Sequence, residues 1–173
     1  MNFKKKSILL AVFAILIIAV FLISNIQSTE NYEKNISENG DFTVTISIDC
    51  KTILNEYEKL DNSLKNTQYV PKNGIILNKT TVWANKGDTV LDILKKATKE
   101  NNIQLEYSQS PNDSYVEGIN HIYEFSCGEL SGWMYKVNGN FANTGCNSYF
   151  VSGNDHIQWI YTCNLGEDIG ENF

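Results

Sequence analysis

The sequence contains no arginine, and this absence narrows the range of possible partners. All 14 basic residues are lysines. Lys4, Lys5 and Lys6 lie before the first apolar run, whereas all 20 acidic residues lie after it. The chain has a net charge of −6, and the part after the apolar run is more acidic still. Because no basic stripe is available to neutralise phosphates, the composition argues against binding to nucleic acid and against docking on anionic lipid.

Motifs for catalysis and for metal binding are also missing. The chain has no G-x-S-x-G, no H-E-x-x-H and no Walker loop. Its two histidines, His121 and His156, are not at the spacing of metal ligands, and its four cysteines form no C-x-x-C pair. The sequence therefore predicts a protein that is not an enzyme and that holds no resident metal or cofactor.

Residues 1–24 have the pattern of a targeting segment. The three lysines precede an unbroken apolar run, Ile8–Ile23, which is near the short limit for spanning a bilayer. We expect an uncleaved signal anchor, with residues 7–24 in the membrane, because no clean small-x-small cleavage site follows the run. A cleaved signal peptide is the alternative. The prediction is a single-pass protein of the cell membrane with its domain on the extracellular face, or a secreted protein if the anchor is cleaved.

The rest of the chain divides into three predicted parts. Residues 25–40 are polar and have no apolar period, which is typical of a flexible linker. Residues 41–165 form the predicted domain and are numerous enough to bury a core. Residues 166–173 are expected to be an acidic tail outside that domain.

Periodicity predicts one helix among several strands. Residues 41–50 alternate apolar and polar side chains, which is the clearest strand pattern in the chain. Asp88 or Thr89 can cap the helix, and Thr89 with Asp92 resembles a capping box. The pair Asn138-Gly139 is typical of a two-residue hairpin turn. Further strands are expected over residues 74–77, 80–84, 103–107, 119–125, 132–137, 149–151 and 157–163.

This order of elements predicts an α+β fold. One main helix would pack on a β-grasp-like mixed sheet, in which the first and last strands are parallel neighbours in the middle. All four cysteines lie in the part expected to be exported, where an oxidising compartment favours disulfides over the alternative of zinc ligation. Cys50 ends the first strand and Cys163 ends the last, so parallel pairing predicts a Cys50–Cys163 disulfide. A Cys127–Cys146 disulfide follows by elimination.

Aromatic side chains are concentrated around the Asn138-Gly139 turn. Trp133 and Tyr135 share one face of a predicted strand, and Tyr149 and Phe150 lie on the strand after the hairpin. Two interpretations are open. These rings either fill the core of a small sheet domain, or they form a rim that contacts a flat hydrophobic ligand or a partner.

The stretch SGWMYKVNG, residues 131–139, resembles the central motif of a family of bacterial surface domains similar to the C-terminal domain of transcobalamin. The resemblance covers residues 42–166. Its other supporting features are Cys50, Pro71 and Gly74, the run Gly87-Asp88-Thr89-Val90, Tyr115-Val116 and Trp159-Ile160-Tyr161.

The resemblance implies a β-grasp-like fold related to the smaller domain of the vertebrate cobalamin carriers. In those carriers a corrin ring lies between a large helical domain and this β domain. By motif match, Trp133 and Tyr135 would contact a ligand, and Tyr149 and Phe150 would add contacts from the adjacent strand. One expected function is therefore a membrane-tethered module that captures a corrinoid for uptake, with a membrane vitamin transporter as partner. The alternative is a structural or adhesive surface module without a small-molecule ligand.

Overall fold

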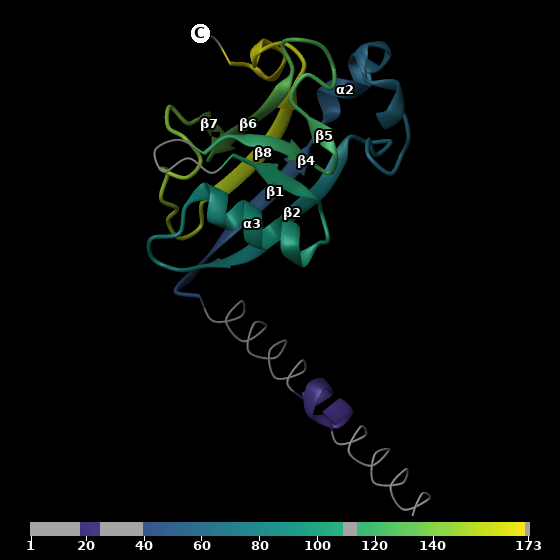
Figure 1. The fold of residues 1–173 in the computed structure, drawn as a ribbon. Helices are drawn as coiled ribbons and strands as arrows, with labels where there is room; N and C mark the ends of the chain where they lie inside the picture. The colour runs from purple at the N-terminus through teal and green to yellow at the C-terminus, as the bar shows by residue number, and fades with distance from the viewer. Residues whose placement is uncertain (1–17, 25–39, 109–113, 172–173) are drawn as a thin grey trace, which may run out of the picture. The chain divides into compact units, whose positions relative to one another are not determined.

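The computed structural model describes residues 18–24, 40–108 and 114–171, and the chain divides into two units, Met1–Asn39 and Gly40–Phe173 (Figure 1). Residues 18–24 of the first unit are helical. Across the described ranges, no helix is both long enough and apolar enough to cross a membrane. This finding overturns the predicted single-pass location in the cell membrane. The rest of the predicted anchor and most of the predicted linker lie outside the described residues.

The second unit combines two sheets with one main helix (Figure 1). The larger sheet has the strand order β2-β1-β8-β6-β7, and the smaller has the order β3-β4-β5. The strands are β1 (Phe42–Asp49), β2 (Ile75–Ala84), β3 (Leu105–Tyr107), β4 (Val116–Ile119), β5 (Ile122–Tyr123), β6 (Gly132–Val137), β7 (Asn140–Phe141) and β8 (His156–Thr162). The helices are α2 (Lys51–Asn55), α3 (Val90–Glu100) and the short 3₁₀ turns η1 (Tyr57–Lys59), η2 (Asn62–Leu64) and η3 (Glu167–Ile169).

The first and last strands of the larger sheet lie side by side in its middle. β1 and β8 are parallel, with pairs running from Thr45 and His156 to Asp49 and Ile160. The other pairs of this sheet are antiparallel. The predicted parallel pairing and the mixed α+β class are therefore confirmed, and both sheets are open.

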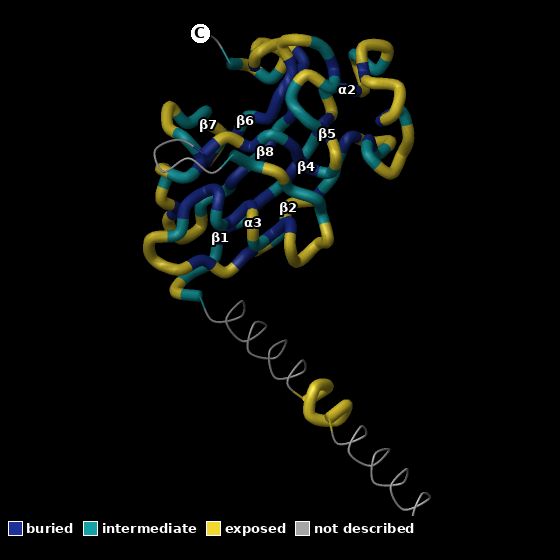
Figure 2. Tube along the Cα trace, in the orientation of Figure 1, coloured by how far each residue is buried: buried dark blue, intermediate teal, exposed yellow. Residues whose placement is uncertain are grey.

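The core lies where α3 and the loops cover the larger sheet. The alternation predicted for residues 41–50 is confirmed, because Val44, Ile46 and Ile48 are buried while the residues between them are partly exposed. The apolar residues of α3 are buried as well: Val90, Leu91, Ile93, Leu94 and Ala97. Figure 2 shows this buried layer beneath an exposed outer surface.

The start of α3 follows from two side chains. Thr89 Oγ1 accepts a hydrogen bond from the Asp92 amide at 3.3 Å, and Asp92 Oδ2 accepts one from the Thr89 amide at 3.1 Å. This reciprocal arrangement is the predicted capping box. Partial burial raises the pKa of Asp92, but its hydrogen bonds to Thr89 and its contact with Lys95 outweigh burial and hold the pKa below its usual value. Asn101 caps the other end of the helix.

The strands of the structure differ from the predicted ones in three places. Residues 75–84 form one strand with a register shift opposite Ile46 and Ile48, instead of two short strands. The predicted strand 119–125 is interrupted because Asn120 and His121 turn the chain with φ of 54° and 65°. Residues 149–151 form no strand, and Phe150 makes only an isolated bridge to Thr89.

Candidate functional site

Trp133, the first residue expected to contact a ligand, lies in the core. Its side chain is only 5% exposed, and its indole Nε1 donates a hydrogen bond to the Ile122 carbonyl at 2.8 Å. Its ring meets the ring of Tyr161 edge to face, with centroids 5.2 Å apart. The donor and the apolar surface of Trp133 are therefore both already engaged within the domain.

Tyr135 is also buried, at 9% exposure. Its hydroxyl donates to the Thr144 carbonyl at 2.6 Å, which fastens β6 to the loop after β7. Its ring centroid lies 5.3 Å from that of Trp159 and 6.4 Å from that of Tyr149. Tyr149 itself is half-buried and packs against the core.

Phe150 differs from the other three residues, because 66% of its side chain is exposed. The structure thus brings Trp133, Tyr135 and Tyr149 together through aromatic and core packing, and it places Phe150 on the surface beside the start of α3. Of the four predicted ligand contacts, Phe150 offers the most accessible ring.

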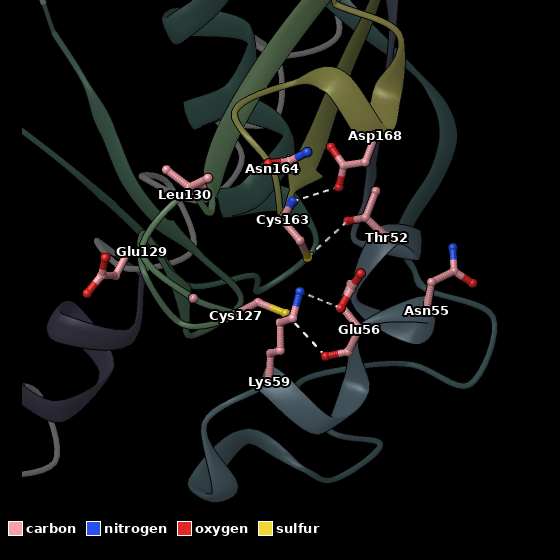
Figure 3. A pocket seen from close by; sticks show the side chains of 11 residues that line it. Thr52, Asn55, Glu56, Lys59, Cys127, Glu129, Leu130, Cys163, Asn164 and Asp168 are labelled. Carbon is pink, nitrogen blue, oxygen red and sulfur yellow. Dashed lines mark hydrogen bonds and ion pairs between the residues drawn. The ribbon is translucent and has the colours of Figure 1, made fainter.

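A second region, which sequence reasoning missed, forms an open pocket at the C-terminal end of β8 (Figure 3). We call it the sheet-end pocket. Its volume is about 560 Å³, and it lies where α2 and η1, the loop after β5 and the segment after β8 meet. The lining residues are Thr52, Asn55, Glu56, Lys59, Cys127, Gly128, Glu129, Leu130, Cys163, Asn164 and Asp168.

One wall of the pocket comes from α2 and η1. Thr52 Oγ1 donates to the Tyr161 carbonyl at 2.6 Å, which ties α2 to the last strand. Lys59 Nζ pairs with Glu56 Oε2 at 2.8 Å, and this pair stands at the pocket surface. The pairing with Glu56 raises the pKa of Lys59, so its ammonium group stays charged.

Another part of the lining comes from the segment expected to be an acidic tail. Asp168 in η3 accepts hydrogen bonds from the Cys163 amide, at 2.8 Å, and from the Thr162 hydroxyl. Lys136 Nζ donates to the Ile169 carbonyl at 2.9 Å, so η3 is also held by β6. Described residues of this segment therefore pack on the domain and shape the pocket.

The cysteines correct the predicted disulfide pairing. All four are buried and none is joined in a disulfide, so neither Cys50–Cys163 nor Cys127–Cys146 is bonded in the structure. Since Asp49 pairs with Ile160, Cys163 lies beyond the end of the parallel ladder and not beside Cys50. The prediction assumed that β1 and β8 end at the same level of the sheet. In the structure Cys163 lies three residues after Ile160, whereas Cys50 directly follows Asp49.

Cys163 instead shares the sheet-end pocket with Cys127 (Figure 3). The Cys127 Sγ lies 3.6 Å from the Glu56 carbonyl, and the Cys163 Sγ lies 3.7 Å from Thr52 Oγ1. Cys146 is elsewhere and donates to the Ser114 carbonyl at 3.2 Å. Burial raises the pKa of both pocket thiols, and the interaction of the two thiols lowers the pKa of Cys127 and raises that of Cys163.

The chemistry of the pocket is polar and ionic at its rim and thiol-based at its floor. Within the described ranges, no group of three or more histidine, cysteine, aspartate or glutamate side chains is placed to hold a metal ion. The sequence contained one signal for this region. Thr52 and Glu56 are four residues apart and Glu56 and Lys59 are three apart, spacings that bring side chains to one side of a helical segment.

Comparisons with known proteins agree with the resemblance in the sequence. Residues 87–162 match the model of the family described as "Domain of unknown function (DUF4430)". Among solved structures, the chain is similar to haptocorrin in complex with Cbi. The TM-score is 0.51 and the sequence identity 17%, over 72% of this chain and 25% of the haptocorrin chain. The chain thus spans about a quarter of that structure.

A protein from Ruminococcus gnavus ATCC 29149, to which metal binding is provisionally assigned, is similar with a TM-score of 0.42 and 10% identity. That match covers 70% of this chain and 97% of the other. A likeness this weak does not inform the site. A search of curated proteins found no match. The expected resemblance is nevertheless confirmed: residues 87–162 carry a domain matching DUF4430, on a transcobalamin-like fold shared with part of haptocorrin.

Proposed function

We propose that this chain is a ligand-binding module that receives a small organic ligand in the sheet-end pocket, with a corrinoid as the ligand class. The observation that carries the proposal is the pocket itself. Its volume of about 560 Å³ falls within the range of small-molecule sites, and it combines Leu130 with the charged groups of Lys59, Glu56 and Asp168.

The corrinoid class is supported by the similarity to haptocorrin in complex with Cbi. That similarity reaches only 25% of the haptocorrin chain, so a site shared between domains would be represented here by one part of it. An open pocket suits such a role, because a second surface can close over the ligand. Trp133 and Tyr135 need not contact the ligand in this arrangement, since their polar groups already have partners in the domain.

The test is a calorimetric titration of the purified full chain with cobinamide and with cobalamin. We expect binding at micromolar affinity or better for at least one of them. Leu130→Ala should weaken binding at least tenfold, because Leu130 lines the pocket and is 46% exposed. Leu165→Ala is the matched control, an exposed leucine outside the pocket lining.

A second pair of variants locates the ligand if it binds elsewhere. Phe150→Ala removes the exposed aromatic ring near the start of α3, and Phe125→Ala removes a ring of similar exposure, 66% against 62%. If Phe150→Ala abolishes binding and Leu130→Ala does not, the site lies at Phe150 and the pocket assignment is wrong. Absence of heat with both ligands, on a folded sample, would contradict the corrinoid class.

The second candidate function is a structural or adhesive module without a small-molecule ligand. The observation that favours it is the burial of Trp133 and Tyr135, since both aromatic side chains of β6 belong to the core. This candidate predicts that neither corrinoid binds, and that Leu130→Ala changes neither the folding nor any titration.

A further inference from the structure

We propose that Cys127 and Cys163 are a redox-active pair, joined by a disulfide when the protein meets an oxidising thiol–disulfide couple and separated when it is reduced. This bond would link the loop after β5 to the end of β8 across the floor of the sheet-end pocket. The inference does not depend on the proposed function, because it concerns the covalent state of the protein and not a bound ligand.

The first argument is position. Both side chains line the same pocket, and Figure 3 shows them extending into the same part of it. Both sulfurs lie against the α2–η1 segment, one at the Glu56 carbonyl and the other at the Thr52 hydroxyl. The mutual effect of the two thiols on their pKa values agrees with this shared position.

The second argument is that both backbones are held in place. The Cys127 amide donates to Ser131 Oγ at 3.0 Å, and that hydroxyl donates to the Gly128 carbonyl at 2.7 Å. On the other side, the Cys163 amide donates to Asp168 at 2.8 Å. Both chain segments are therefore fixed where they line the pocket, and a disulfide between them requires Cα atoms no more than about 7 Å apart.

The other two cysteines lack these properties. Cys50 is fully buried at the end of β1, and burial raises the pKa of its thiol to about 12. Cys146 is 3% exposed and lies against the Ser114 carbonyl. Neither lines the sheet-end pocket, and Cys163, at 8% exposure, is the most accessible of the four cysteines, so an external reagent meets Cys163 first.

The exchange proceeds in two balanced steps with a low-molecular-weight or protein disulfide as oxidant. The Cys163 thiol, 8% exposed, loses its proton, and its thiolate attacks one sulfur of the external disulfide and releases the other as a thiol. The Cys127 thiolate then attacks Cys163 Sγ and displaces the second external thiol. Two protein thiols are oxidised and one external disulfide is reduced to two thiols.

Charged groups around Cys127 act in opposite directions on its ionisation. Burial raises the pKa of the thiol, and this is the largest effect. The interaction with the Cys163 thiol and the charge of Lys59 lower the pKa, whereas Glu56 and Asp168 raise it. Lys59 therefore assists the second step by favouring the Cys127 thiolate, without contacting the external disulfide.

The experiment maps disulfides in the full chain after incubation with oxidised glutathione. Free thiols are alkylated, and the protein is cleaved after lysine and before aspartate. Cleavage after Lys136 and before Asp155 places Cys127, Cys146 and Cys163 on separate peptides, and cleavage after Lys51 separates Cys50 from all three. The expected result is a Cys127–Cys163 linked peptide that dithiothreitol releases, with Cys50 and Cys146 modified only after unfolding.

Two variants sharpen this result. Oxidation should raise the Tm of the protein, because a disulfide restricts the unfolded chain. Cys163→Ser should remove both the linked peptide and this rise in Tm, whereas the matched control Cys146→Ser should retain both. Recovery of Cys127 and Cys163 as separately alkylated peptides after oxidation, or a link from either to Cys50 or Cys146, would overturn the proposal. None of these outcomes depends on whether a corrinoid binds.

Discussion

Strand β6 contributes aromatic residues to the core, whereas the sheet-end pocket is lined mainly by polar and charged residues. The two regions also differ in how many of their side-chain groups already have a partner within the domain. In β6 the polar atoms of Trp133 and Tyr135 are paired with backbone carbonyls, and their rings are packed. In the pocket, a charged pair stands at an open surface, and two buried thiols line the same pocket. In this domain the aromatic cluster of the sequence therefore belongs to the core, and the accessible charged groups lie elsewhere.

The largest expected effect on stability comes from removing an aromatic ring of β6. Trp133→Ala should lower the free energy of unfolding by ~3–5 kcal/mol, because it leaves a cavity beside Tyr161. It also leaves the Ile122 carbonyl without its indole donor. Chemical denaturation followed by circular dichroism measures the loss. Phe150→Ala is the control and should change stability by only about 0.5 kcal/mol, since that ring is exposed. Equal effects of the two substitutions would contradict the assignment of Trp133 to the core.

An intermediate effect is expected where the pocket meets the core. Asp168→Ala should cost about 1–2 kcal/mol, because the buried Thr162 hydroxyl and the Cys163 amide both lose their acceptor. The same denaturation experiment measures it. Glu167→Ala removes an equal charge from the adjacent residue, whose contact is an exposed hydrogen bond from Asn164, and should cost less. If Glu167→Ala is the more damaging substitution, η3 is not held by Asp168.

The smallest effect on stability is expected at the pocket rim. There the quantity to measure is the rate of disulfide formation. Lys59→Met breaks an exposed ion pair and should leave the denaturation midpoint unchanged. It should nevertheless slow formation of the Cys127–Cys163 disulfide severalfold, because the nearby positive charge that favours the Cys127 thiolate is lost. Alkylation at timed intervals after addition of oxidised glutathione gives the rate. Lys65→Met is the control, since Lys65 pairs with Glu58 and does not line the pocket.

Local patterns in the sequence predicted elements whose causes are themselves local. The capping box of Thr89 and Asp92 depends on residues three apart, and it occurs as expected. The Asn138-Gly139 turn depends on two residues that accept positive φ, here 54° and 84°, and it joins β6 to β7. Alternation along β1 also predicted which of its side chains are buried.

The sheet-end pocket could not be predicted in the same way, because its lining residues come from segments far apart in the chain. Motif similarity pointed to Trp133 and Tyr135, but the pairing of β6 with β8 buries both rings. The sequence did not predict the exposure of Phe150 either, because residues 149–151 were expected to form a strand and do not. Only the packing of the loops over the sheet distinguishes these three aromatic residues.

The sequence by itself determined the alternation of β1, the boundaries of α3, the hairpin at Asn138-Gly139 and the parallel placement of the first and last strands. These features follow from side-chain periodicity, capping and turn chemistry, which act over a few residues, and from the limited number of ways to cover a small sheet. Tertiary structure alone decided which cysteines are neighbours. A shift of a few residues beyond the β1–β8 ladder carries Cys163 away from Cys50 and into a pocket with Cys127, and no local pattern encodes that displacement.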